Sequence, residues 1–248
     1  MNISWNISDK DIQKVKKILN ENNNPFFKKR KKLNVEKKSI VLNKDTVIKT
    51  MAMCLLTSQQ RSGPSSTVGI FLQKKPFPLT YKLINQEMDV ENFVIQIFKE
   101  NSLTRYINRI SHFFAANIEK IQNDNWTIVN ELKNLKSINS KIEERKYADE
   151  LADRFDGFGP KQSRNFLQSL GLTKYEIPID SRITNWLNDF GFPVTLTSSA
   201  LGDRGYYHFV SDGIQMLCDK ANTFPCMLDA AIFSSFDNGE WTEENTIF

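Results

Sequence analysis

The sequence has few residues of the kinds that form cross-links and bind metals. Its 248 residues include three cysteines, Cys54, Cys218 and Cys226, and two histidines. The number of cysteines is odd, and no Cys-x-x-Cys spacing occurs. These features argue against a disulfide scaffold, a structural zinc site and a cysteine-ligated iron–sulfur cluster. We therefore expect a protein with reduced cysteines.

Long apolar runs are absent as well. The longest apolar stretch in the first part of the chain is Met51–Leu56, far shorter than the roughly 18 residues that a membrane-spanning helix requires. The first residues carry neither a basic flank nor an apolar segment of the kind that directs secretion. We expect a cytoplasmic protein that does not contact membranes.

Positively charged residues outnumber negatively charged residues only slightly. The sequence has 33 Lys and Arg against 29 Asp and Glu, a formal net charge of +4. The isoelectric point of about 8.8 falls just short of about 9, above which many nucleic-acid-binding domains lie. The basic residues gather at Lys28–Lys32 and at Lys37 and Lys38, either as a solvated loop or as a phosphate-contacting patch. Arg105 and Arg109 can likewise be either solvated or in contact with phosphates.

Apolar residues recur at helical spacing through most of the chain, which predicts an all-α fold. Ser8 and Asp11 resemble a capping box, Asn22–Pro25 ends the helix that follows them, and Asp45 is placed to open the next helix. The clearest apolar stripes run over 147–155 and 183–190. Strand-like alternation is restricted to a short piece at 194–196.

The segment Asp156–Ser163 predicts a tight turn between two helices. Gly157 and Gly159 allow a sharp turn and a close approach of another chain, and Pro160 suits the first position of a new helix. The free amides at that helix start carry partial positive charge, so they can hold one phosphate without reading a base. A Gly-x-Gly turn alone is weak evidence, because many helix connections contain one.

A carboxylate 19 residues after Lys161 strengthens the functional interpretation. Asp180 lies in Pro178-Ile179-Asp180, at the start of a predicted helix over 181–190. In a purely structural interpretation Asp180 is the N-cap of that helix and Lys161 is a solvated lysine in a first turn. Both residues can fill these roles and still take part in chemistry.

With these motifs the sequence resembles the helix-hairpin-helix/GPD superfamily of base-excision DNA glycosylases, most closely its 8-oxoguanine glycosylase/lyase branch. The matching pieces are Ser58-Gln59-Gln60, Gly157-Phe158-Gly159-Pro160-Lys161, Pro178-Ile179-Asp180 and Asp229-Ala230-Ala231-Ile232-Phe233-Ser234. The resemblance implies two helical lobes with a DNA-binding cleft between them. One lobe would be 45–172, ending in the helix-hairpin-helix, and the other 1–44 together with 173–248. The partner would be double-stranded DNA containing a modified base, bound by a monomer.

The resemblance also implies a role for each site residue. Lys161 would attack C1′ of the sugar of an extruded nucleotide, giving Schiff-base chemistry with AP lyase activity, while Asp180 assists cleavage of the base. The DNA phosphates would meet Gly157, Gly159 and Arg182. Gln60 would fill the gap in the base stack. The base pocket would be formed by Phe233, Asp229 and Asn165, with Phe233 stacking on the base. No metal and no organic cofactor is needed for this chemistry.

Two pocket positions differ from the animal and fungal 8-oxoguanine enzymes. Asn165 stands where that branch carries a cysteine, and Asp229 stands where it carries a glutamine. Because a carboxylate only accepts hydrogen bonds, Asp229 suits guanine N1–H and N2–H₂ or the N4 amine of cytosine. We expect oxidised guanine as the substrate. The alternatives are another modified base, such as a hypermodified cytosine of phage DNA in antiviral defence, and a non-catalytic helix-hairpin-helix DNA-binding module.

Overall fold

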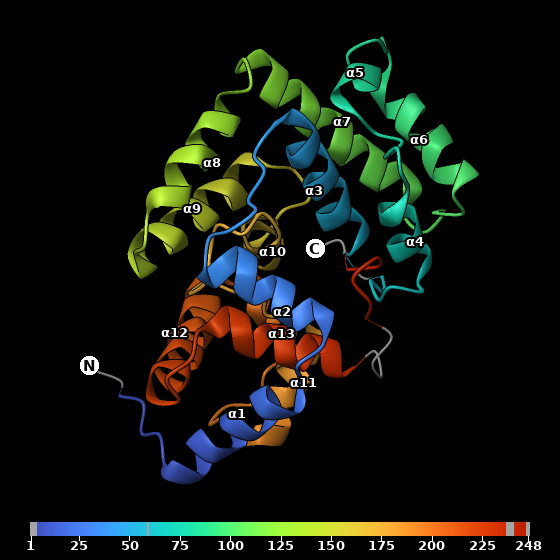
Figure 1. Ribbon diagram of the computed structural model, residues 1–248. Helices are drawn as coiled ribbons and strands as arrows, with labels where there is room; N and C mark the ends of the chain where they lie inside the picture. Colours follow the sequence, from blue (N-terminus) through green and yellow to red (C-terminus); the bar gives the residue numbers. More distant parts are fainter. Residues whose placement is uncertain (1–3, 59, 237–240, 247–248) are drawn as a thin grey trace.

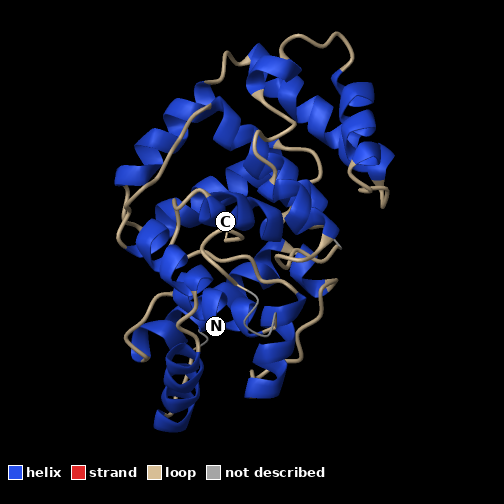
Figure 2. Ribbon diagram, turned by 45° about the vertical axis from the view of Figure 1, so that its right-hand side comes forward, coloured by secondary structure: helices blue, strands red, loops and turns tan. Residues whose placement is uncertain are grey.

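The computed structural model describes residues 4–58, 60–236 and 241–246, and within these ranges the chain is helical without a strand (Figure 2). The prediction of an all-α fold is confirmed. The piece predicted as extended at 194–196 forms no strand. None of the helices in the described ranges combines the length and the apolar character that crossing a membrane requires.

Thirteen α-helices and two short irregular helices follow one another along the described chain. In chain order they are α1 (Asp9–Glu21), α2 (Pro25–Arg30), the π-helix η1 (Lys31–Val35), α3 (Lys44–Leu56), α4 (Thr67–Gln73), α5 (Tyr81–Ile84), α6 (Val90–Glu100), α7 (Ile107–Asn123), α8 (Thr127–Ser137), α9 (Lys141–Arg154), α10 (Pro160–Ser169), α11 (Ser181–Phe190), the 3₁₀-helix η2 (Ala200–Gly202), α12 (Arg204–Lys220) and α13 (Pro225–Ser235).

Side-chain caps define the helix starts near the N-terminus. The Ser8–Asp11 capping box at α1 is confirmed, and α1 ends before Pro25 as predicted. The predicted start of α3 at Asp45 is wrong. Asn43 caps α3 instead, since its side-chain oxygen accepts a hydrogen bond from the Thr46 backbone N–H at 2.9 Å. The Asp45 carboxylate accepts from the Tyr81 backbone N–H at 2.6 Å, in another segment.

The buried apolar side chains form two large clusters. One contains residues between Val47 and Leu172, and the other combines Val15 with residues between Ile177 and Ile232. Helices from the two ends of the described chain lie side by side, because α2 packs on α13 and α1 packs on α12 and α13 (Figure 1). The division into 45–172 and 1–44 with 173–248 stays a prediction.

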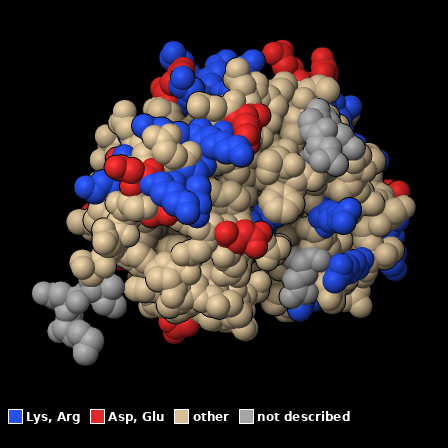
Figure 3. Space-filling view, turned by 90° about the horizontal axis from the view of Figure 1, so that it is seen from below, with Lys and Arg blue, Asp and Glu red and all other residues tan. Residues whose placement is uncertain are grey.

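The basic run at 28–32 lies in helices α2 and η1, so the solvated loop, one of the two alternatives for this run, is wrong, and the phosphate-contacting patch stays a prediction. Arg30 is buried, and its guanidinium donates to the Gln168 carbonyl at 2.7 Å. Lys29 donates to the Thr246 carbonyl at 2.6 Å, and Lys37 donates to the Gly171 carbonyl at 3.2 Å. Three members of this basic sequence therefore tie the N-terminal segment to distant parts of the fold. On the face seen in Figure 3, Lys and Arg side chains lie in separate groups with Asp and Glu between them.

Candidate active site

The turn between α9 and α10 is fixed by a side chain from α7. Asn117 is buried, donates to the Asp156 carbonyl at 2.9 Å, and accepts from the Asp156 N–H at 2.8 Å. Gly157 has a φ of 75°, and a Cβ there would come within 2.5 Å of the Phe113 ring. This position therefore requires glycine for both its backbone conformation and its packing.

Gly159 has a different environment. A Cβ at this position would meet nothing within 4 Å, so the backbone is open to a close approach by another molecule. Gly159 is the N-cap of α10, and Pro160 takes the first helical position, as predicted. Lys161 follows in the first turn. The phosphate contact predicted for this turn stays a prediction.

Asp180 caps α11, as the structural interpretation predicted. One carboxylate oxygen accepts from the backbone N–H groups of Arg182 and Ile183 at 2.9 and 3.1 Å. The other oxygen pairs with the Arg182 guanidinium Nε at 3.0 Å. Three donors thus fix the orientation of the carboxylate.

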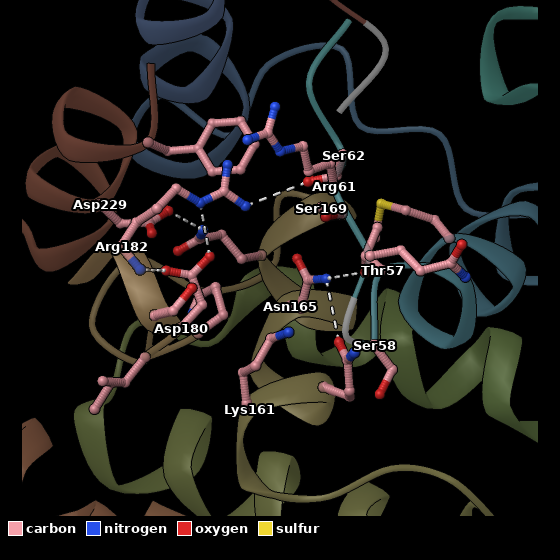
Figure 4. A pocket seen from close by; sticks show the side chains of 18 of the residues that line it. Thr57, Ser58, Arg61, Ser62, Lys161, Asn165, Ser169, Asp180, Arg182 and Asp229 are labelled. Atoms are coloured by element: carbon pink, nitrogen blue, oxygen red, sulfur yellow. Dashed lines mark hydrogen bonds and ion pairs between the residues drawn. The ribbon is translucent and has the colours of Figure 1, made fainter. Parts of the chain in front are cut away.

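Lys161 and Asp180 line the same cavity, which has a volume of about 1040 Å³ and is drawn in Figure 4. The nine residues that the sequence pointed to all line it, namely Gln60, Gly157, Gly159, Lys161, Asn165, Asp180, Arg182, Asp229 and Phe233. Its charged lining residues are Arg30, Arg61, Arg105, Lys161 and Arg182 against Asp180 and Asp229. The excess of positive charge suits an anionic ligand.

Burial lowers the pKa of the Lys161 ammonium below its ordinary value of 10.5. The nearby Asp180 carboxylate opposes this effect, and the Arg182 guanidinium adds to it. Since only the neutral amine is a nucleophile, the environment of Lys161 increases the reactive fraction at neutral pH.

The ring of Phe233 is already covered. The Arg182 guanidinium carbon lies 3.9 Å from the ring centroid, and the Phe26 ring stacks on Phe233 at 4.8 Å with an interplanar angle of 20°. Arg182 also donates to the Ser62 hydroxyl at 3.3 Å. A base that stacks on Phe233 therefore has to displace a neighbouring group, and the stacking role stays a prediction.

Two other predicted site residues also make local contacts. The Gln60 amide donates to the Leu56 carbonyl at 3.0 Å, so filling a gap in a base stack would require it to leave the end of α3. Asn165 makes two long contacts, 3.5 Å to the Thr57 hydroxyl and 3.4 Å to the Gln162 side-chain oxygen. Gln59 lies outside the described residues.

Buried groups that the sequence did not indicate hold the segment before Asp180 against α10 and α12. The Tyr207 hydroxyl donates to the Ile177 carbonyl and accepts from the Ile179 N–H, both at 2.7 Å. Arg164 lies one helical turn after Lys161, and its guanidinium donates to the Glu176 carboxylate at 2.9 Å. Tyr207 itself is fully buried in the core.

Asp229 has the most strongly perturbed carboxyl group of the cavity. It is 5% exposed, and burial raises its pKa from 3.8 to about 6 against the opposing effect of Arg30. The Gln168 side-chain amide donates to one carboxylate oxygen at 2.5 Å. Gln168 follows Lys161 and Asn165 on one face of α10, at spacings of four and three residues. That spacing could have indicated Gln168 from the sequence.

Replacing Asp229 with asparagine should stabilise the fold above pH 6. The raised pKa means that the folded state disfavours the ionised carboxylate, so the wild type loses stability as the pH rises from about 4 to about 6. An asparagine does not titrate, and its oxygen can still accept from Gln168. Thermal unfolding of both proteins between pH 3.5 and 8 should give equal stabilities at the acid end and a difference of about 3 kcal/mol at pH 8. A variant that is less stable at every pH would contradict this prediction.

The structure of the described ranges contains no group of three or more His, Cys, Asp or Glu side chains that could hold a metal ion. Cys54, Cys218 and Cys226 are free and buried. The expectation that the chemistry needs no metal or cofactor stays a prediction.

No protein-family model matches the sequence, and no curated protein matches it. The structure is similar to the crystal structure of the 8-oxoguanine DNA glycosylase of Methanocaldococcus jannaschii, with a TM-score of 0.66. The similarity covers 93% of this chain and 96% of that chain, at 16% sequence identity. It shows that the chain has the helical fold of that glycosylase.

Proposed function

We propose that this protein is a DNA glycosylase that extrudes a modified nucleotide into the cavity, removes its base and cleaves the strand at the resulting abasic site. The main support is the position of Lys161 and Asp180, which come from the starts of two different helices and line one cavity. The similarity in fold to a glycosylase supports the same proposal. Oxidised guanine is the proposed substrate class.

In the proposed reaction the neutral Lys161 amine forms a bond to C1′ while the bond between C1′ and the base breaks. The departing base takes the bonding electron pair and is then protonated, and the amine loses its proton. The C1′–O4′ bond then breaks as the nitrogen forms a double bond to C1′, and O4′ takes the electron pair and a proton, which opens the sugar ring and gives the Schiff base. Loss of a proton from C2′ of this Schiff base eliminates the 3′ phosphate in the lyase step. Partial burial prepares Lys161 for this role, because burial disfavours its charged form.

Asp180 is proposed to act mainly through its charge. Its carboxylate accepts hydrogen bonds from three donors that belong to Arg182 and Ile183. A fixed negative charge in a partly buried site stabilises the positive charge that develops on the sugar as the base leaves. The same hydrogen bonds hold the carboxylate in place before the reaction.

Arg182 is proposed to contact a DNA phosphate once the nucleotide enters. Replacing it with glutamine should weaken binding to abasic DNA and lower the slope of log affinity against log salt by about 0.9, the effect of one lost phosphate contact. The matched control is Arg204→Gln, at an arginine that pairs with Asp153 in a second pocket. Fluorescence anisotropy between 50 and 200 mM salt measures the slope, and equal slopes for wild type and Arg182→Gln would contradict the phosphate contact.

The proposed function is tested with purified protein and duplexes that each carry one modified base. Mass spectrometry identifies the released base, and gel electrophoresis detects strand cleavage. Release of an oxidised guanine would support the proposal in full, and release of a hypermodified cytosine would correct the substrate alone. Tight, salt-dependent binding with no base release and no cleavage of abasic DNA would instead indicate a non-catalytic DNA-binding module.

A further inference from the structure

Gln168 lies at the end of the cavity where Asp229 is found, and its position is fixed from two sides. Its side chain is 1% exposed, and its backbone carbonyl accepts from Arg30 at 2.7 Å and from the Asn34 amide at 2.9 Å. Its side-chain amide donates to Asp229 at 2.5 Å. Both donors to the carbonyl come from the N-terminal segment, so Gln168 is held rigidly before any ligand arrives.

The orientation of the Gln168 amide follows from its partner. A carboxylate only accepts, so the nitrogen of the amide must face Asp229 and the oxygen must point elsewhere. That oxygen is buried and has no hydrogen-bond partner among the described residues. A buried polar atom without a partner is costly unless a ligand or water satisfies it. The second oxygen of Asp229 likewise accepts no hydrogen bond from the described residues, and both side chains line the cavity.

We propose that the side-chain oxygen of Gln168 and the second carboxylate oxygen of Asp229 together read the edge of the extruded base, and that they select a base with two adjacent N–H donors. This inference rests on the proposed function and deepens it. Guanine and its oxidised forms present N1–H and N2–H₂ side by side. Adenine and cytosine each present one amine next to a ring nitrogen that accepts, which would place an acceptor against an acceptor.

Three duplexes test the proposal, identical except that one base is 8-oxoguanine, 8-oxohypoxanthine or 8-oxoadenine. Since 8-oxohypoxanthine lacks only the N2 amine, the wild type should release it at least about tenfold more slowly than 8-oxoguanine, and 8-oxoadenine more slowly still. Gln168→Met keeps the size of the side chain and removes its acceptor, so this variant should lose most of the discrimination. Gln122→Met, on α7 and outside the cavity lining, is the matched control and should keep it.

Asp229→Asn gives the sharper test, because it should change the preference. The oxygen of the introduced amide must face the Gln168 amide nitrogen, so the nitrogen of the introduced amide would be presented to the base as a donor. A donor beside the Gln168 acceptor matches the adenine edge. The ratio of release rates should therefore shift towards 8-oxoadenine by about tenfold or more, whereas simple damage to the site would lower both rates together.

The outcomes separate the failure of this inference from the failure of the proposed function. Abasic DNA carries no base to read, so a borohydride-trapped adduct with an abasic duplex reports the Lys161 chemistry alone. If the wild type forms this adduct but shows no preference among the three bases, or if Gln168→Met and Asp229→Asn keep the wild-type preference, the reading role is wrong and the glycosylase proposal stands. If the wild type forms no adduct and releases no base, both proposals fall.

Discussion

Replacing Lys161 with glutamine should abolish the borohydride-trapped adduct between the protein and DNA that contains an abasic site. The amide has no nucleophilic nitrogen, so no Schiff base can form. Base release should fall by about 10²-fold or more, because the covalent route is lost. Gel electrophoresis of the trapped adduct and mass spectrometry of the released base provide the two measurements.

Lys146→Gln is the matched control for this experiment. It is the same substitution at an exposed lysine of α9, in the second pocket, and the adduct should form normally. The Lys161→Gln protein should be at least as stable as the wild type, because it no longer buries an ammonium group. An adduct that persists in Lys161→Gln would show that another amine is the nucleophile.

The lowered pKa of Lys161 also has a kinetic consequence. Adduct formation requires the neutral amine, so its rate should rise with pH and level off above the pKa of Lys161. Because burial lowers this pKa, the plateau should begin below 10.5, the ordinary pKa of a lysine. Rates of trapping between pH 6 and 10.5 measure the profile. A rate that still climbs tenfold per pH unit near pH 10 would contradict the lowered pKa.

Replacing Asp180 with asparagine should lower base release by about 10²- to 10³-fold, the range seen when one fixed electrostatic group is lost from an active site. Asparagine caps helices about as well as aspartate, so α11 should remain intact. Affinity for abasic DNA should stay within a few fold of wild type. Single-turnover base release, anisotropy and thermal unfolding together test this prediction.

Asp180→Ala separates catalysis from capping. Alanine removes both the charge and the cap, so it should lose the same activity and also destabilise the protein by about 0.5–2 kcal/mol. If Asp180→Asn keeps near-wild-type release while Asp180→Ala is unstable and inactive, then Asp180 is a structural cap and the proposed electrostatic role is wrong.

Local patterns in the sequence predicted most of the helical framework. Apolar spacing, the capping box at Ser8, the turn around Gly157 and the start of α11 after Asp180 depend on residues close together in the chain, and all four are found in the structure. The start of α3 was the exception, because Asn43 and Asp45 are both able to cap a helix and the contact between Asp45 and Tyr81 is not visible in the sequence.

The contacts that shape the cavity were much harder to predict. Arg30 lies in a run of basic residues that indicates a solvated surface, yet it is buried against a carbonyl 138 positions later in the chain. The hydroxyl of Tyr207 and the amide of Gln168 likewise form hydrogen bonds with residues that are distant in the sequence. The position of Arg182 over Phe233 could not be inferred either, because the sequence does not show which side chains of the cavity contact one another in the protein without DNA.

The packing of α2 against α13 means that the cavity combines segments that are synthesised at different times. The cavity needs Arg30 and Asn34 from the beginning of the chain, α10 and Asp180 from the middle, and Asp229 near the end. On the ribosome, a growing chain that has already exposed Lys161 still lacks the helix that carries Asp229. A cavity lined by both Lys161 and Asp229 can therefore form only after α13 has been synthesised.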